Sequence, residues 1–263
     1  MQPVTGIFSS QDDARRSIAS LRSTGIPTEK IILLTPGDLQ TGPESVPTDA
    51  AEQPGMGKAI GAVIGAAGGL SAGGLLAAAV IPGVGPVTAV GVLGAAVLAA
   101  SGATVGAATG GALENFTTTG LPEDELFVYE DALRKGRSVV IVITEDGHDA
   151  APIRELLEVE GAEAVDAARQ QWWIGLQGAE REHYSASGRD FQNDEKFYRL
   201  GFETALHARH RCQEFDQVSA EMANRVEEMQ RQHPGADVAE AFARGYERGR
   251  EYYQNLCDES EAA

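Results

Sequence analysis

The sequence predicts an α+β protein: a ferredoxin-like α/β sandwich, interrupted by a glycine-zipper helical hairpin and followed by a C-terminal helical module. Three observations favour this fold class. Strand and helix patterns alternate on both sides of a long apolar block, the block has no charged residue from position 59 to position 113, and the end of the chain is helical in pattern. The predicted domains are a split sandwich at 1–56 and 114–169, a hairpin at 57–113, a linker at 170–196 and the helical module at 197–263.

The first part of the sandwich is predicted to be a strand, a helix and a second strand. Residues 4–8 alternate and are rich in strand formers, and Ser9 or Ser10 can cap a helix that ends at Gly25. Residues 30–34 form a short apolar run, which is typical of a buried strand.

The second part of the sandwich begins at Pro122, which is followed by three acidic residues in the first turn of a predicted helix that Gly136 closes. A buried strand is predicted at 138–144, a helix at 150–160 and a weak edge strand at 162–167. The two parts together supply four strands and their crossover helices.

Glycines at a spacing of four residues dominate the apolar block. Such a spacing places them on one face of an α-helix, and Pro82 and Pro86 bound a turn between two halves. The sequence therefore predicts a hairpin of two glycine-zipper helices that associate through this face. The predicted oligomerisation residues are Gly57, Gly61, Gly65, Gly69, Gly73, Gly94, Gly102, Gly106 and Gly110.

Three arrangements would give these glycines a close partner. The hairpins enter a membrane and assemble there, or they pack together in the dry interior of a water-soluble oligomer, or each hairpin folds only on itself. Each predicted arm is long enough to cross a bilayer, which favours the membrane. Lys58 is the one basic residue beside the block, whereas several acidic residues flank it, which is unfavourable at a membrane surface.

The residues after the sandwich are polar apart from Ile174, Leu176 and a pair of tryptophans, Trp172 and Trp173, and are predicted to form a linker. These two side chains are expected either to anchor the linker or to pack on the sandwich. In the following module, one aromatic and glycine pattern occurs twice at an offset of 44 residues, which predicts that the two copies pack on each other, with a helix at 218–231 between them. The predicted packing residues are Tyr198, Gly201, Phe202, Phe242, Gly245, Tyr246 and Gly249.

The composition limits the choice of partners and compartment. The net charge of −18 and the pI of about 4.6 exclude a nucleic-acid ligand. Only Cys212 and Cys257 are present, and the first residues lack the pattern of an export signal, so we expect a cytoplasmic protein, on the cytoplasmic side if it associates with a membrane. The sequence predicts no catalytic residues, no metal site and no cofactor, because the histidines have no suitably placed partners.

The flanking segments resemble the YflT-like general stress protein family. The similar stretches are the opening VTGIFSSQDDARRSIASLRSTGIPTEKIILL and the later GLPEDELFVYEDALRKGRSVVIVIT, and the resemblance covers about residues 3–35 and 116–168. It implies a small α/β domain connected with bacterial stress responses, often with a glycine-rich insert, and no established catalysis.

The sequence therefore predicts a non-enzymatic, stress-associated protein that forms a homo-oligomer through its glycine-zipper hairpin, in or against a membrane lipid surface. The first alternative is a soluble homo-oligomeric scaffold or shell with the hairpins in its interior. The second is a small-ligand binder or an enzyme that uses a cleft of the sandwich. The sequence does not identify a partner for the C-terminal module.

Overall fold

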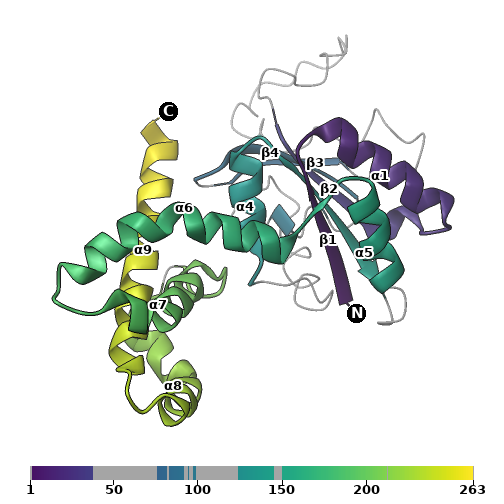
Figure 1. Cartoon of the computed structure of the whole chain (residues 1–263). Coiled ribbons are helices and arrows are strands. Elements are labelled where there is room, and N and C mark those ends of the chain that lie inside the picture. The colour runs from purple at the N-terminus through teal and green to yellow at the C-terminus, as the bar shows by residue number, and fades with distance from the viewer. Residues whose placement is uncertain are drawn as a thin grey trace. The chain divides into compact units, whose positions relative to one another are not determined.

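The structure is a computed structural model of the whole chain, shown in Figure 1, and it describes residues 2–37, 76–81, 83–91, 94, 97–98, 124–144, 150–211 and 213–262. These residues form two compact units. One lies within residues 1–121 and 129–165, and the other within residues 122–128 and 166–263. We call them the sheet unit and the C-terminal unit.

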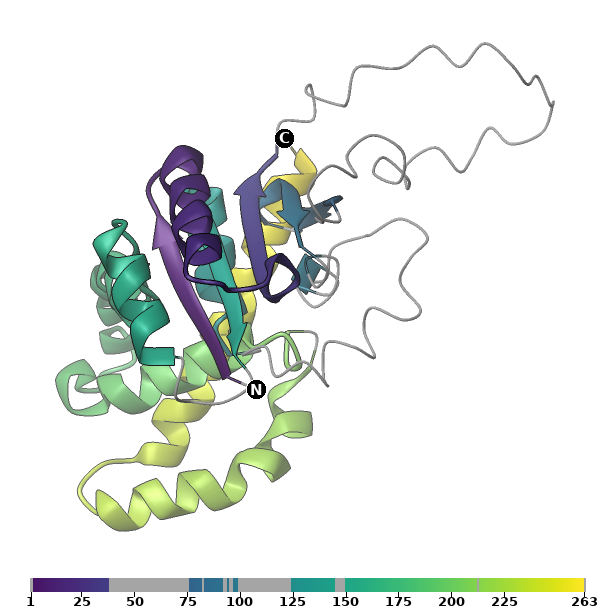
Figure 2. The same ribbon diagram turned by 90° about the vertical axis from the view of Figure 1, so that its right-hand side faces the viewer.

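The sheet unit contains a six-stranded antiparallel sheet in the order β3-β4-β2-β5-β1-β6, which confirms the α+β class (Figure 2). Its helices are α1 (Gln11–Ser23), the short 3₁₀ helix η1 (Thr28–Lys30), α5 (Ala150–Val159) and most of α4 (Leu126–Arg134). The strands are β1 (Gln2–Phe8), β2 (Ile31–Pro36), β3 (Leu76–Ile81), β4 (Gly85–Val90), β5 (Ser138–Thr144) and β6 (Glu163–Ala164).

Both faces of the sheet are covered, which explains why its central strands are apolar without alternation. On one face, α1 and α5 enclose a core that includes Phe8, Leu21 and Val140. On the other face, the buried Tyr129 of α4 shares a hydrogen bond of 2.9 Å with Thr5 of β1. All seven residues of β5 are buried, so β5 is the centre of this unit.

The predicted helical hairpin is wrong for the residues on both sides of its predicted turn, although Gly94, Val97 and Leu98 further along the chain are helical. Residues 76–81 and 85–90 form the two strands of a β-hairpin, and β4 pairs along β2 so that Leu34 lies opposite Ala89. Gly83 and Gly85 adopt φ angles of 74° and 100°, which suit the tight turn between the strands. Alanine-rich sequence favours a helix locally, but here β2 supplies backbone partners for β4, and β4 supplies them for the alanine-rich β3.

The C-terminal unit contains four helices in its described part: α6 (Val165–Ser185), α7 (Phe191–Leu206), α8 (Phe215–Gln232) and α9 (Val238–Ala262). The predicted linker at 170–196 is therefore wrong, because α6 continues through Ser185 and α7 begins at Phe191. The polar character of this segment favoured a connection, but it is a helix in which Trp172 and Trp173 are buried and Gly175 and Gly178 are exposed.

No helix in the described ranges is both long enough and apolar enough to cross a membrane.

Candidate association surfaces

The two edges of the sheet differ in length and in charge. At one edge, β6 has only two residues, and its Glu163 forms an ion pair of 2.6 Å with Arg137. At the other edge, β3 has six residues with the sequence LAAAVI, without charge or proline. Within the described part of the chain, β3 has a strand partner, β4, on one side only. Natural edge strands are usually short, charged or bulged, and these features prevent pairing with another molecule. β6 has them and β3 does not.

The β3–β4 hairpin is held firmly on the sheet unit. Ile81, Val87 and Ala89 are buried, and Arg134 of α4 donates from Nε to the carbonyl oxygen of Gly83 in the turn at 2.5 Å. Val80, the neighbour of Ile81, points away from this core and is 45% exposed. The hairpin therefore presents β3 as a fixed edge with one exposed valine.

One of the predicted zipper glycines can be located. Gly94 is helical, and a Cβ built on it would lie 2.8 Å from the Cβ of Ala89, so this glycine packs on β4 of its own chain. The other zipper positions, Gly57, Gly61, Gly65, Gly69, Gly73, Gly102, Gly106 and Gly110, lie outside the described residues.

The structure brings together the seven residues singled out in the C-terminal module. A Cβ built on Gly201 of α7 would overlap the carbonyl oxygen of Phe242, and one built on Gly245 of α9 would overlap the carbonyl oxygen of Tyr198. Gly249 lies in the same way against Phe202, with 2.5 Å from its built Cβ to the carbonyl oxygen. The two helices therefore touch through their backbones, which only glycine permits at these positions.

The tryptophan pair belongs to the same core. Trp173 contacts Phe202 with ring centroids 5.8 Å apart, and Trp172 contacts Phe202 at 5.9 Å and Tyr252 at 6.3 Å. The indole nitrogen of Trp173 donates to Glu195 at 2.8 Å. Both side chains are buried inside the C-terminal unit, so they are core residues of this unit and not the anchor of a linker.

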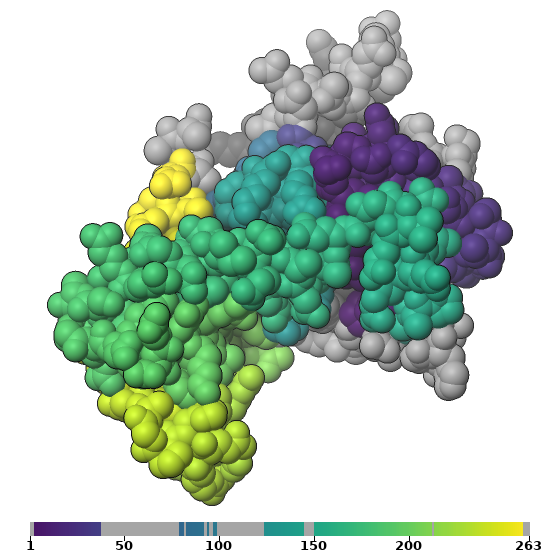
Figure 3. Space-filling view, viewed as in Figure 1, coloured from purple at the N-terminus to yellow at the C-terminus, as the bar shows by residue number. Residues whose placement is uncertain are grey.

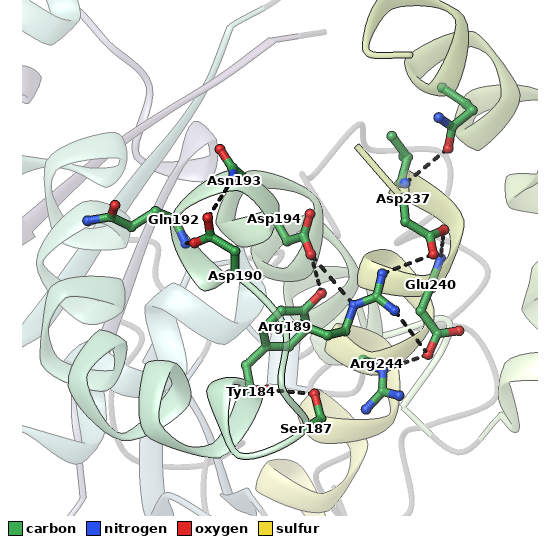
Figure 4. A network of polar contacts seen from close by, with 12 residues as sticks. Tyr184, Ser187, Arg189, Asp190, Gln192, Asn193, Asp194, Asp237, Glu240 and Arg244 are labelled. Atoms are coloured by element: carbon green, nitrogen blue, oxygen red, sulfur yellow. Dashed lines mark hydrogen bonds and ion pairs between the residues drawn. The ribbon is translucent and has the colours of Figure 1, made fainter. Parts of the chain in front are cut away.

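Figure 4 shows a polar network at the start of α7 and α9, around Arg189. Tyr184 donates to Asp194 at 2.7 Å, and Arg189 lies 3.7 Å from Asp194 and 2.9 Å from Asp237. Burial and the Asp194 carboxylate raise the pKa of Tyr184 to about 12. The hydrogen bond from Arg189 lowers the pKa of Asp237. Arg189 thus joins the N-terminal ends of α7 and α9.

A second network joins three helices deeper in the unit. Glu180 of α6 is buried, accepts a hydrogen bond of 2.7 Å from Tyr198 of α7, and pairs with Arg248 of α9 at 3.1 Å. Burial and this carboxylate raise the pKa of Tyr198. Sequence reasoning missed this network because Glu180 and Arg248 are 68 positions apart and neither stands in a recognisable motif.

An open groove of about 380 Å³ lies beside these networks. Its lining includes Tyr184, Tyr198 and a charged face of α9. Arg244 pairs with Glu240 at 2.6 Å and Arg248 with Glu251 at 3.1 Å, both within α9, whereas the pair of Arg248 with Glu180 joins α9 to α6.

The described ranges contain no group of three or more His, Cys, Asp or Glu side chains that could hold a metal ion. Comparisons with protein-family models, with curated proteins and with solved structures found no match to this chain. The candidate surfaces are therefore the β3 edge and the glycine-mediated contact of α7 with α9.

Proposed function

We propose that this protein is a non-enzymatic assembly protein that forms homo-oligomers through its uncharged mid-chain block. The observation that carries the proposal is the β3 edge, a six-residue apolar strand at the end of a firmly held sheet. A β-strand with an open edge offers a row of backbone donors and acceptors to another strand. A second copy brings an identical uncharged strand, which can pair with β3 in antiparallel fashion.

The proposal keeps the predicted role of the apolar block and changes the mechanism from helix packing to strand pairing. In the ferredoxin-like arrangement that we propose for β1, β2, β5 and β6, the β3–β4 hairpin extends the sheet beyond β2. This places the uncharged segment at the sheet margin, where two copies can meet around a two-fold axis. A role in stress responses follows from the family resemblance alone, and membrane association stays a prediction of the sequence.

Two exposed valines allow a matched test. Val80 lies on the β3 edge and is 45% exposed, and Val159 lies at the end of α5 and is 80% exposed. The Val80→Lys variant should convert the oligomer to monomers, because a lysine on an edge strand opposes pairing. Val159→Lys adds the same charge elsewhere and should leave the mass unchanged. Light scattering after size-exclusion chromatography measures both variants.

Two results would refute the proposal. One is a monomeric wild-type protein at every concentration, and the other is a wild-type oligomer whose mass Val80→Lys leaves unchanged. The net charge of −18 also makes copies repel each other, so the oligomer should become tighter as salt is added. Alkaline extraction of a membrane fraction tests membrane insertion separately, since an inserted protein stays with the membrane.

A further inference from the structure

The contact between α7 and α9 is symmetric in a way that its sequence pattern alone does not show. Gly201 meets Phe242, and Gly245 meets Tyr198. Adding 44 to Tyr198 gives Phe242, and adding 44 to Gly201 gives Gly245, so the second contact is the first with the roles of the helices exchanged. Ala205 and Gly249, also 44 apart, face each other, with 2.9 Å from the built Cβ of Gly249 to the Cβ of Ala205.

Such reciprocity is the property of a two-fold interface between identical partners, in which residue i contacts j and j contacts i. Along both helices the contacts advance in the same direction, from Tyr198 with Gly245 to Phe202 with Gly249. Helix α7 therefore presents to α9 nearly the same surface that α9 presents to α7. The partner that fits this surface is another helix with an aromatic residue, a glycine three positions later, and a small residue four positions after that glycine.

A second copy of this chain supplies such a helix. We propose that the C-terminal unit pairs with another copy by exchanging α9, so that α7 of each chain packs against α9 of its partner. This inference concerns a different surface from the β3 edge. The contacts of α9 with α6 and α7 can form in the exchanged pair, including those of Glu180 with Arg248 and of Trp172 with Tyr252, because α6 and α7 stay together and receive an identical α9. The hydrogen bonds from Tyr246 to the carbonyl oxygens of His210 and Gln213 join α9 to the hinge, and they must break when the unit opens.

Helix α8 makes the exchange possible. It connects α7 to α9, and Val218 is its one fully buried residue among those described. It is attached to α9: the ring of Phe215 lies 5.6 Å from that of Tyr246, and Gln230 accepts a hydrogen bond of 3.0 Å from the backbone of Val238. The α8–α9 pair can therefore move as one body, about the segment between Leu206 and Phe215.

Concentration decides between the closed and the exchanged form. A tethered α9 is present at an effective concentration in the millimolar range, so the closed form is favoured in dilute solution. Refolding at high protein concentration should produce exchanged dimers, which should persist on dilution because their separation requires the helices to come apart.

Complementary variants of the full chain provide the test, made in the Val80→Lys background so that pairing at the β3 edge does not contribute. Gly201→Leu blocks the contact from the α7 side and Gly245→Leu blocks it from the α9 side, so in neither variant can α7 pack against α9 of the same chain. Refolded together, the two chains can form one intact pair, from α7 of the Gly245→Leu chain and α9 of the Gly201→Leu chain.

We expect the mixture to recover about half of the wild-type tryptophan fluorescence signal and to show a mixed dimer in native mass spectrometry when one chain carries a heavy-isotope label. A mixture of Gly175→Leu and Gly178→Leu chains is the control. In the described part of the chain, no atom lies within 4 Å of a Cβ built on either glycine, so each chain should close by itself and mixed dimers should stay rare. Two results together would overturn the exchange. The first mixture would show no mixed dimer, and the Val80→Lys protein without further changes would stay monomeric after refolding at high concentration. Either result leaves the β3 proposal intact, because its test compares the mass of the wild-type protein with that of Val80→Lys, whereas the exchange test compares proteins that all carry Val80→Lys.

Discussion

Replacing a helical glycine by alanine should have opposite effects at two places in the C-terminal unit. Gly245 of α9 lies against the backbone of α7, where a Cβ would overlap the carbonyl oxygen of Tyr198. A Cβ built on Gly178 of α6 would have no atom of the described residues within 4 Å. The chemical change is the same, and both residues lie inside α-helices, so the difference between the variants isolates the contact.

The magnitudes follow from two terms. In a helix, alanine is more favourable than glycine by about 1 kcal/mol, so Gly178→Ala should raise the free energy of unfolding by up to that amount. At Gly245 the same gain is opposed by overpacking, which typically costs about 1–3 kcal/mol. The obstacle there is a backbone carbonyl that cannot rotate away, which favours the upper end of this range. We expect Gly245→Ala to lower the free energy of unfolding by about 1–2 kcal/mol.

Urea unfolding followed by tryptophan fluorescence measures the effect directly, because both tryptophans of the chain lie in the core of this unit. Gly178 is exposed, and α6, in which it lies, forms part of the visible surface of the C-terminal unit in the space-filling view (Figure 3). If Gly245→Ala proves as stable as the wild type while Gly178→Ala is stabilised, the close contact of α7 with α9 does not exist in solution.

Two further predictions concern pH and helix capping. Above about pH 10 the C-terminal unit should lose stability. Burial holds the pKa of Tyr184 and of Tyr246 at about 12, above the ordinary value of 10.0 that applies after unfolding. Each of these tyrosines therefore lowers the free energy of unfolding by about 1.4 kcal/mol for every pH unit between these two values. Phenolate absorbance should then rise together with the loss of fluorescence, and ionisation of these groups near pH 10 in the folded protein would contradict the reasoning. In the sheet unit, Ser10→Ala should lower the free energy of unfolding by about 1 kcal/mol, because Ser10 is the N-cap of α1 and its side chain accepts a hydrogen bond of 3.1 Å from the backbone N–H of Asp13. Urea unfolding followed by circular dichroism measures this change. Ser23→Ala, at an exposed position, is the control and should lower the free energy of unfolding by less.

Local sequence patterns were sufficient for much of the sheet unit. The predicted strand at 138–144 coincides with β5, and the predicted strands at 4–8 and 30–34 overlap β1 and β2. These elements combine strong strand composition with clear turn residues, such as Gly136 with its φ of 75°. Patterns of this kind act over a few residues, so the sequence reveals them without knowledge of the partners.

The hairpin and the supposed linker could not be predicted because their structure depends on distant partners. In β3 and β4, small residues compatible with either a helix or a strand become strands beside β2. In α6, Trp172 and Trp173 are buried because aromatic side chains of α7 and α9 pack against them, and the mostly polar sequence around the two tryptophans does not reveal these distant partners. The 44-residue repeat was visible because it is a comparison within the chain, but the exchange symmetry of its contacts needed coordinates.

The two proposed interfaces have a joint consequence for assembly. Each joins two copies around a two-fold axis, β3 by strand pairing and α9 by exchange, and the two surfaces are made of different residues. A subunit with two different two-fold interfaces builds a closed tetramer when the axes intersect suitably and an open filament when they do not. After refolding at high concentration, the Val80→Lys protein should therefore form no species larger than a dimer, whereas the wild-type protein should form species larger than a dimer. Because refolding at low concentration favours the closed C-terminal unit, the same wild-type protein prepared in that way should stop at the species that β3 alone can form.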